Sequence, residues 1–134
     1  MGIYIVKSLH SEWFKLGHHK IKENRPSVYY RYINRGFYSC KCPEEIKEKL
    51  GFNDVKLLFW FENLNIDDEY KIHEKIKKLY EHEGEWYKFN NIDEIITIIS
   101  NDFNGINKMP SEEDYNNAIK WSEKYKSRFK KLTN

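Results

Sequence analysis

Apolar residues near the start of the sequence fall into two short runs separated by a mostly polar stretch. The first run, residues 2–6, is rich in β-branched side chains and contains a tyrosine, which favours an extended strand. The second run is residues 13–17, and the connecting residues 8–12 suit a short hairpin loop. The pattern therefore predicts a β-hairpin.

The rest of the chain carries signals for two further strands and for helices. The most apolar run, Val55–Glu62, has the length and the polar flanks of a central strand buried on both faces, and Glu85–Phe89 predicts another strand. Ser111, followed by three acidic residues, predicts the N-cap of a long last helix with a basic end. Helices are predicted over residues 27–34, 43–50, 66–80, 92–99 and 111–132.

The predicted helix over residues 66–80 carries a carboxylate on its apolar face. At helical spacing one stripe collects Glu69, Ile72, His73, Ile76, Leu79 and Tyr80. A carboxylate on an inward face is unfavourable unless it is paired or binds a metal. Glu69 is therefore a candidate for a chemical role, although a hydrogen bond to His73, four residues on, would satisfy it as well.

Composition sets limits on the class of protein. The 134 residues, 40% of them hydrophobic, fit one domain with a real core. No apolar run approaches the roughly 20 residues of a membrane span, and residues 2–6 are too few for the apolar part of a signal peptide, so an intracellular location is expected. Cys40 and Cys42 lack a second pair at metal-binding spacing and are expected to be reduced thiols.

The small net charge of +2 hides an uneven distribution. Residues 7–41 contain eight Lys or Arg against two acids, whereas residues 43–102 contain eight Lys against fifteen acids. A basic segment beside the predicted hairpin favours an anionic partner, and a solvated basic loop would explain the charge equally well.

The hairpin residues resemble a known motif. The sequences GIY at 2–4 and KLG at 15–17 resemble the paired signature of the GIY-YIG nuclease superfamily, with Lys15 where the second tyrosine usually stands. That lysine is similar to a branch found in phages, large DNA viruses and some restriction enzymes. Three further features resemble the same branch and follow one another in the same order: residues 31–33 (RYI), Glu69 with His73, and residues 84–87 (GEWY). The resemblance covers residues 2–89.

The resemblance implies an α+β fold: a small three-stranded antiparallel sheet flanked by helices, here with an added C-terminal helix. We expect residues 1–102 to form this nuclease-like domain. Residues 103–134 are expected to form a loop and a basic helix that pack on the same domain or extend it.

The resemblance also implies roles for individual residues. Tyr4 would be the general base, Glu69 the ligand of Mg²⁺ or Mn²⁺, and Arg31 a bidentate partner of a phosphate oxygen. Lys15 would supply a charge that lowers the pKa of Tyr4, or would itself polarise the water; the sequence leaves both open. His73 would support Glu69 from one turn further along the helix.

Further basic residues are candidates for contacts with nucleic acid: His18, His19, Arg25 and Arg35. Arg25 also rivals Arg31 as the catalytic arginine, because it follows Gly17 at a spacing that some family members use. Arg31 is preferred because Arg25 precedes Pro26 and is expected to lie outside the helix.

The resulting hypothesis is a metal-dependent DNA endonuclease. A non-catalytic nucleic-acid-binding module of the same fold is the alternative, and a purely structural interaction protein is a third reading. DNA is the expected partner, no membrane association is expected, and the sequence leaves open whether the protein is a monomer or a homodimer.

Overall fold

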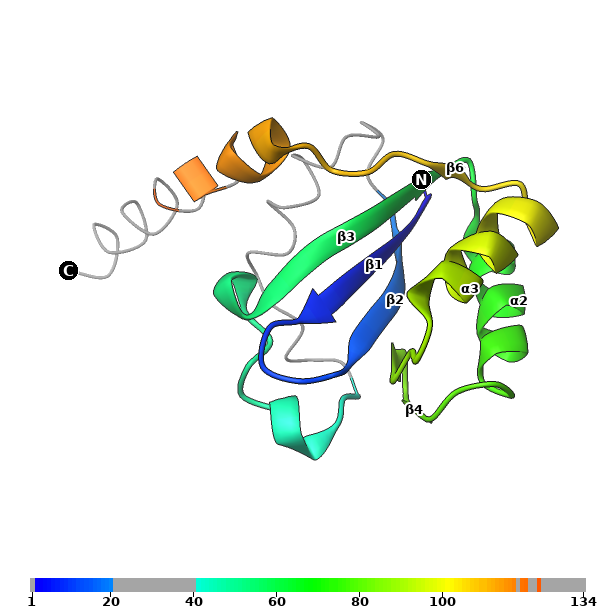
Figure 1. Ribbon diagram of the computed structural model, residues 1–134, viewed down its shortest axis with the longest axis horizontal. Helices are drawn as coiled ribbons and strands as arrows, with labels where there is room; N and C mark the ends of the chain where they lie inside the picture. Colours follow the sequence, from blue (N-terminus) through cyan, green and yellow to red (C-terminus); the bar gives the residue numbers. More distant parts are fainter. Residues whose placement is uncertain (1, 21–40, 118, 121–122, 124–134) are drawn as a thin grey trace.

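The computed structural model describes residues 2–20, 41–117, 119–120 and 123, which form an α+β fold with an antiparallel sheet (Figure 1). Among these residues the sheet has six strands in the order β4-β5-β2-β1-β3-β6. The strands are β1 Gly2–Ser8, β2 Phe14–His19, β3 Val55–Glu62, β4 His82–Glu83, β5 Trp86–Tyr87 and β6 Ile106–Asn107. Helix α2 is Ile66–Ile76, and helix α3, Ile92–Thr97, continues into a π-helical turn, Ile98–Asp102. Residues 112–117, at the start of the last helix, are helical as well.

The predicted hairpin and the predicted strand over Val55–Glu62 are both confirmed. The expectation of three strands is wrong for the sheet as a whole, because β4, β5 and β6 add to β1, β2 and β3. Each added strand has two residues, which is too short to give an alternating pattern in the sequence. The predicted strand over Glu85–Phe89 is therefore reduced to Trp86–Tyr87.

The middle one of the three long strands is β1, which is buried on both faces, and β3 lies one place further out. In β1 every residue except Lys7 is buried, whereas Lys56 of β3 is exposed. The prediction that β3 is the central strand is thus wrong. The reason is that β1 has a long neighbour on each side, β2 and β3. On its outer side, β3 is paired among the described residues only with the short β6, and only through Phe61 and Glu62.

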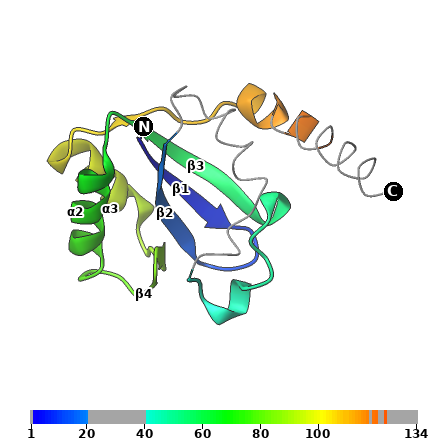
Figure 2. The ribbon, with the colours of Figure 1, turned by 180° about the vertical axis from the view of Figure 1, so that it is seen from behind.

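Alternation along β1 sends side chains into two cores on opposite faces of the sheet. Ile3 and Ile5 join the core beneath α2 and α3, which lie together on one side of the long strands (Figures 1 and 2). Tyr4 and Val6 join the other core, which also contains Trp60 and Trp86. The sheet is therefore a middle layer, and Tyr4 points away from the helices.

Three predicted helices differ from the observed ones in length. Helix α2 begins at a capping box between Asn65 and Asp68, and ends at Ile76 instead of residue 80. The chain then turns, which leaves Leu79 53% exposed instead of on the inward face. Over residues 43–50 a single 3₁₀ turn, Glu44–Ile46, replaces the predicted helix. Helix α3 is α-helical to Thr97, not to residue 99.

The start of the last helix agrees with the prediction. The Ser111 hydroxyl accepts a hydrogen bond from the Asp114 N–H at 3.1 Å, and the Asp114 carboxylate accepts one from the Ser111 N–H at 3.0 Å. This reciprocal cap satisfies two N–H groups at the helix start. The predicted helix over residues 27–34 and the end of the last helix lie outside the described residues. In the part of the chain that is described, no helix has the length and apolar character to cross a membrane.

Candidate active site

Tyr4 and Lys15 meet because of the register of the β1–β2 hairpin. Tyr4 pairs with Gly17 and Val6 pairs with Lys15, so the side chains of Tyr4 and Lys15 leave the sheet on the same face. The Lys15 ammonium donates a hydrogen bond to the Tyr4 hydroxyl at 2.8 Å. Both side chains are enclosed, with exposed fractions of 3% for Tyr4 and 2% for Lys15.

Gly17 provides the space for this contact. A Cβ atom at Gly17 would lie 2.2 Å from the Tyr4 hydroxyl oxygen, 2.3 Å from Tyr4 Cζ and 2.8 Å from Lys15 Nζ. These separations are far inside van der Waals contact, so no side chain fits at residue 17 while Tyr4 keeps its position. The glycine of the second motif half is therefore explained by the tyrosine of the first.

We expect Gly17→Ala to destabilise the protein by about 1–3 kcal/mol, the usual range for overpacking a filled core. Thermal unfolding should show a melting temperature several degrees below that of the wild type. Lys20→Ala, at an exposed residue just beyond β2, is the matched control and should leave the melting temperature nearly unchanged. A wild-type melting temperature in Gly17→Ala would contradict the close approach of Tyr4.

Glu85 reaches Lys15 through the short β4–β5 hairpin. Trp86 pairs with Lys15, and the backbone carbonyl of Glu85 accepts a hydrogen bond from the Leu16 N–H at 3.1 Å. This places the Glu85 carboxylate 2.6 Å from Lys15 Nζ. Gly84, with a φ of +60°, allows the tight turn that Gly84 and Glu85 form between β4 and β5.

Lys15 is therefore held between an oxygen of Tyr4 and an oxygen of Glu85. Burial alone would lower the pKa of Lys15, but the charges and hydrogen bonds of Tyr4 and Glu85 outweigh it and raise the pKa. The side chain is thus a buried ammonium ion at neutral pH. The Glu85 side chain is 44% exposed, so the row Tyr4–Lys15–Glu85 runs from the core to the surface.

Helix α2 brings two more functional groups to the surface end of this row. One donor atom each from Glu69, His73 and Glu85 lie within 4.8 Å of one another. Glu69 Oε2 and His73 Nε2 are both buried and have no hydrogen-bond partner within the described part of the chain. His73 is held from its other side, where Nδ1 hydrogen-bonds the Tyr87 hydroxyl.

The surroundings shift the pKa values of the two α2 residues in opposite directions. Burial and the neighbouring Glu85 raise the pKa of Glu69 to about 7, although Lys15 opposes the shift. Burial lowers the pKa of His73 to about 4, although Glu85 opposes that shift. At neutral pH His73 is therefore a neutral imidazole, and Glu69 is a carboxyl group that a nearby cation would readily ionise.

In the metal-free protein, Glu69→Gln should raise the melting temperature at pH 8 and leave it nearly unchanged at pH 4. The pKa of Glu69 rises from 4.5 to about 7 on folding, so the folded state favours the protonated carboxyl, which Gln imitates. That contribution to stability is present below pH 4.5 and is lost as the pH rises through 7. The measurement is the melting temperature of the wild type and of Glu69→Gln at pH 4 and at pH 8, with a chelator present.

Glu74→Gln is the control for this pH effect, because Glu74 lies on the exposed side of the same helix. An equal gain in Glu74→Gln at pH 8 would contradict a specific effect at Glu69. It would show instead that removing any one negative charge from this acidic helix stabilises the protein at pH 8.

The remaining predicted site residues lie outside this cluster or outside the described residues. His19 is 2% exposed and stacks on Trp60 with 3.8 Å between ring centroids, so its side chain presents almost no surface to a nucleic acid. Burial lowers the pKa of His19 to about 3. His18 is half-buried on the other face of β2, and burial lowers its pKa as well. Outside the described residues lie Arg25, Arg31 and Arg35.

Two residues of the cluster were not among the predicted site residues. Glu85 and Tyr87 belong to the GEWY run that carries part of the family resemblance, but no role was assigned to either. The available signal was the run itself, directly after a glycine. What it lacked was the pairing of Trp86 with Lys15, which brings Glu85 across 70 positions of the sequence to Lys15.

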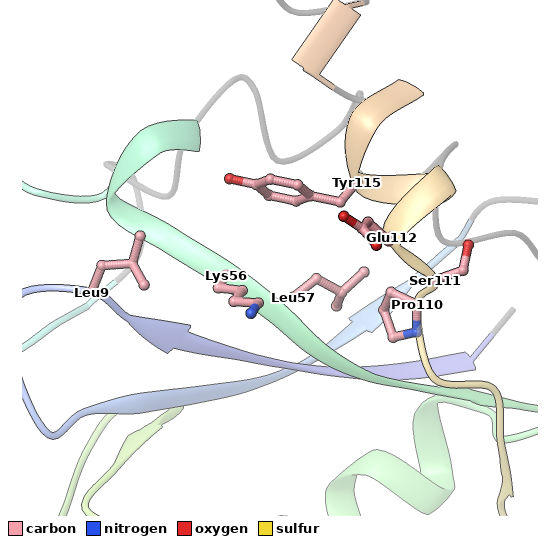
Figure 3. Close-up of a pocket in the computed structure, with 7 residues that line it drawn as sticks. All are labelled: Leu9, Lys56, Leu57, Pro110, Ser111, Glu112 and Tyr115. Carbon is pink, nitrogen blue, oxygen red and sulfur yellow. The ribbon is translucent and has the colours of Figure 1, made fainter.

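A cavity of about 520 Å³ lies elsewhere on the molecule, beside the first residues of β3 (Figure 3). Tyr115 and Glu112, from the start of the last helix, face Leu57 and Lys56 across it (Figure 3). The cavity shares no lining residue with the cluster around Glu69. The acid–base groups of the candidate site therefore open to the surface at a different place.

No protein-family model matches this chain, and neither the curated proteins nor the solved structures contain a significant match. The chemistry of the site follows from its own side chains. Two carboxylates, a neutral imidazole and a buried ammonium–tyrosine pair can bind a cation and move a proton.

Proposed function

We propose that the protein is a metal-dependent endonuclease that hydrolyses phosphodiester bonds in DNA, of the GIY-YIG type that its sequence resembles. The observation that carries the proposal is the convergence of Tyr4, Lys15 and Glu69. They come from β1, β2 and α2, yet Lys15 contacts Tyr4 directly and reaches the Glu69 cluster through Glu85. A random set of motif residues would not be expected to meet in this way.

The arrangement of the long strands supports the fold part of the proposal. The strands β2, β1 and β3 form a three-stranded antiparallel unit, and the motif tyrosine and lysine lie on its central and outer strands. Helices α2 and α3 cover one side of this unit (Figure 2). The two-residue strands β4, β5 and β6 are then additions at its edges.

In the proposed mechanism Tyr4 is the general base. An ammonium ion 2.8 Å from the tyrosine oxygen favours the ionised form of that oxygen, which can then take a proton from the attacking water. Glu85 holds Lys15 in place and keeps it protonated. Arg31 stays the proposed partner of a phosphate oxygen on the basis of the sequence resemblance.

The residues around Glu69 fit a divalent cation. Glu69 Oε2 is a buried oxygen without a described partner, and burial and the neighbouring Glu85 raise the pKa of Glu69, so a cation at this oxygen would stabilise the ionised carboxylate. Glu69, His73 and Glu85 would hold the ion. A bound divalent cation would supply positive charge to the scissile phosphate and to the leaving oxygen.

A nucleic-acid-binding module without catalysis is the second candidate. The observation in its favour is the enclosure of Tyr4 and Lys15, whose exposed fractions are 3% and 2%. A base that water cannot reach would not act. In that case the excess of basic residues over positions 7–41 would bind the phosphate backbone, and the affinity would fall steeply with salt.

The test is to incubate the purified protein with supercoiled plasmid and Mg²⁺ or Mn²⁺, with and without a chelator, and to measure DNA binding in parallel. Conversion to open circles that stops in the chelator supports the nuclease. Salt-sensitive binding without any cleavage, on duplex, branched and single-stranded DNA, would favour the binding module and overturn the proposal.

A further inference from the structure

We infer that Glu69, His73 and Glu85 together bind one divalent transition-metal ion through a mixed oxygen and nitrogen donor set. The inference rests on the proposed function for the use of the ion, but the site is argued from its own geometry. It goes beyond a single glutamate ligand in two respects: it makes the imidazole of His73 a direct ligand, and it makes Glu85 a link between the ion and Lys15.

The spacing of the donor atoms fits a single ion. Metal–ligand bonds to oxygen and nitrogen are about 2.0–2.6 Å long, so ligands on opposite sides of one ion are about 4–5 Å apart, and adjacent ligands are closer. The donor atoms of Glu69, His73 and Glu85 all lie within 4.8 Å of one another. Small rotations of the side chains would bring all three into bonding range of one centre.

His73 is the observation that distinguishes a metal site from a group of acidic residues. His73 is 7% exposed, and its buried Nε2 atom makes no hydrogen bond of ordinary geometry within the described residues, although the Leu16 backbone is near enough to the ring to raise the pKa of His73 slightly against the effect of burial. A buried polar atom without a partner is unfavourable, and here it belongs to the group that converges on Glu69. A metal ion would satisfy Nε2 and the equally unpartnered Glu69 Oε2 at once.

Tyr87 orients this ligand. The hydrogen bond between the Tyr87 hydroxyl and His73 Nδ1 fixes the ring. Nε2 is then the ring nitrogen that can bind a metal ion. Metal-binding histidines usually have such a partner on the second nitrogen. Tyr87 is completely buried, and its ring stacks on His73 with 5.6 Å between centroids, so the ring of His73 has little freedom to turn away.

The donor set favours a transition-metal ion over Mg²⁺. Mg²⁺ prefers oxygen ligands and keeps several waters, whereas an imidazole nitrogen suits softer divalent ions. Mn²⁺ accepts the same octahedral oxygen ligands and tolerates nitrogen, and its unpaired electrons report directly on a nitrogen ligand. It is therefore the probe of choice.

Glu85 connects the ion to the tyrosine–lysine pair. A carboxylate has two oxygens, and in Glu85 one of them, Oε2, accepts the hydrogen bond from Lys15 at 2.6 Å. The other oxygen allows the same group to bind a cation without losing Lys15. The ion and the Tyr4 hydroxyl would thus be joined through only two side chains.

The experiment is an electron paramagnetic resonance titration of the full chain with Mn²⁺, in the wild type and in single variants. The wild type should bind one Mn²⁺ ion, and its spin-echo spectrum should show coupling to a histidine nitrogen. Glu69→Gln and His73→Ala should each weaken Mn²⁺ binding by about 10–100-fold or more. In His73→Ala the nitrogen coupling should vanish and the affinity for Mg²⁺, measured by competition, should change little.

The matched controls are Glu74→Gln, on the exposed side of α2, and His10→Ala, in the β1–β2 loop. Both should bind Mn²⁺ as the wild type does. If His73→Ala fails to fold, the wild type grown with ¹⁵N-histidine still decides the question, because the coupling must change with the isotope. Mn²⁺ bound without any histidine coupling, or no Mn²⁺ binding at all, would overturn the inference.

The failure of this inference can be told apart from that of the proposed function. Histidine-coupled Mn²⁺ in a protein that cuts no DNA would leave the metal site standing and remove the nuclease. Metal-dependent cleavage by a protein whose Mn²⁺ shows no histidine coupling would leave the nuclease standing and remove His73 as a ligand.

Discussion

Glu69→Gln is expected to reduce the rate of metal-dependent plasmid nicking by about 10³-fold. A catalytic metal contributes several kcal/mol to the barrier, and each 1.36 kcal/mol changes the rate tenfold. Of the two carboxylates in the cluster, the one of Glu69 comes from helix α2. Its Oε2 atom is buried and has no hydrogen-bond partner among the described residues. Glutamine removes one of the two carboxylates of the cluster, and we expect the fold to be retained because glutamine imitates the protonated carboxyl group.

The control variant Glu74→Gln should nick the plasmid at the wild-type rate, because Glu74 is exposed on the far side of α2. Rates are compared at matched Mn²⁺ concentrations, and thermal melts establish that both variants are folded. Nicking by Glu69→Gln within threefold of the wild-type rate would contradict a metal site at this residue.

Lys15→Met should lower the nicking rate by about 10²–10⁴-fold at neutral pH, the usual contribution of a general base. Methionine keeps most of the length of lysine but removes the charge beside the Tyr4 hydroxyl. Without that charge the ionised Tyr4 oxygen loses the ammonium group that would stabilise it, so a higher pH is needed to ionise Tyr4. The rate of the variant should therefore go on rising with pH over a range in which the rate of the wild type has already levelled off.

A pH–rate profile from pH 6 to pH 9.5 measures this effect and separates it from a loss of structure. Lys15→Arg, which keeps a positive charge, should retain more activity than Lys15→Met. Lys56→Met, at an exposed lysine of β3, is the control and should leave the profile unchanged. A profile of unchanged shape in Lys15→Met would show that the charge of Lys15 does not act on the base.

The elements predicted correctly are those whose signal is local. The hairpin has two apolar runs joined by a short polar loop, and β3 is one continuous apolar run with clear ends. Helical spacing alone also puts Glu69 on the side of α2 that carries Ile72 and Ile76, both of which are buried, whereas its role as a metal ligand stays a prediction.

The features that sequence reasoning missed depend on contacts between distant parts of the chain. Glu85 meets Lys15 only because β5 pairs with β2, and a strand of two residues has no periodicity to recognise. The place of β1 in the middle of the long strands depends on its pairing with β2 and β3, which its own sequence does not reveal. The role of Gly17 as space for Tyr4 likewise requires the hairpin register.

The structure shows the surroundings of Lys15, the residue at which the sequence departs from the motif that it resembles. Lys15 is enclosed with Tyr4 on one side and Glu85 on the other, instead of standing exposed on the strand. A tyrosine at residue 15 could not form an ion pair with Glu85. The lysine and Glu85 are therefore best regarded as a pair, and a variant at one is expected to alter the other.

The most direct test of the proposed nuclease is the rate at which Tyr4→Phe nicks supercoiled plasmid in Mn²⁺, relative to the wild type. Phenylalanine keeps the buried ring and removes only the hydroxyl oxygen that contacts Lys15. The account predicts metal-dependent nicking by the wild type and a rate at least about 10²-fold lower in Tyr4→Phe, with Mn²⁺ binding retained. Equal rates in the two proteins, or a wild type that cuts no DNA with any divalent ion, would contradict it.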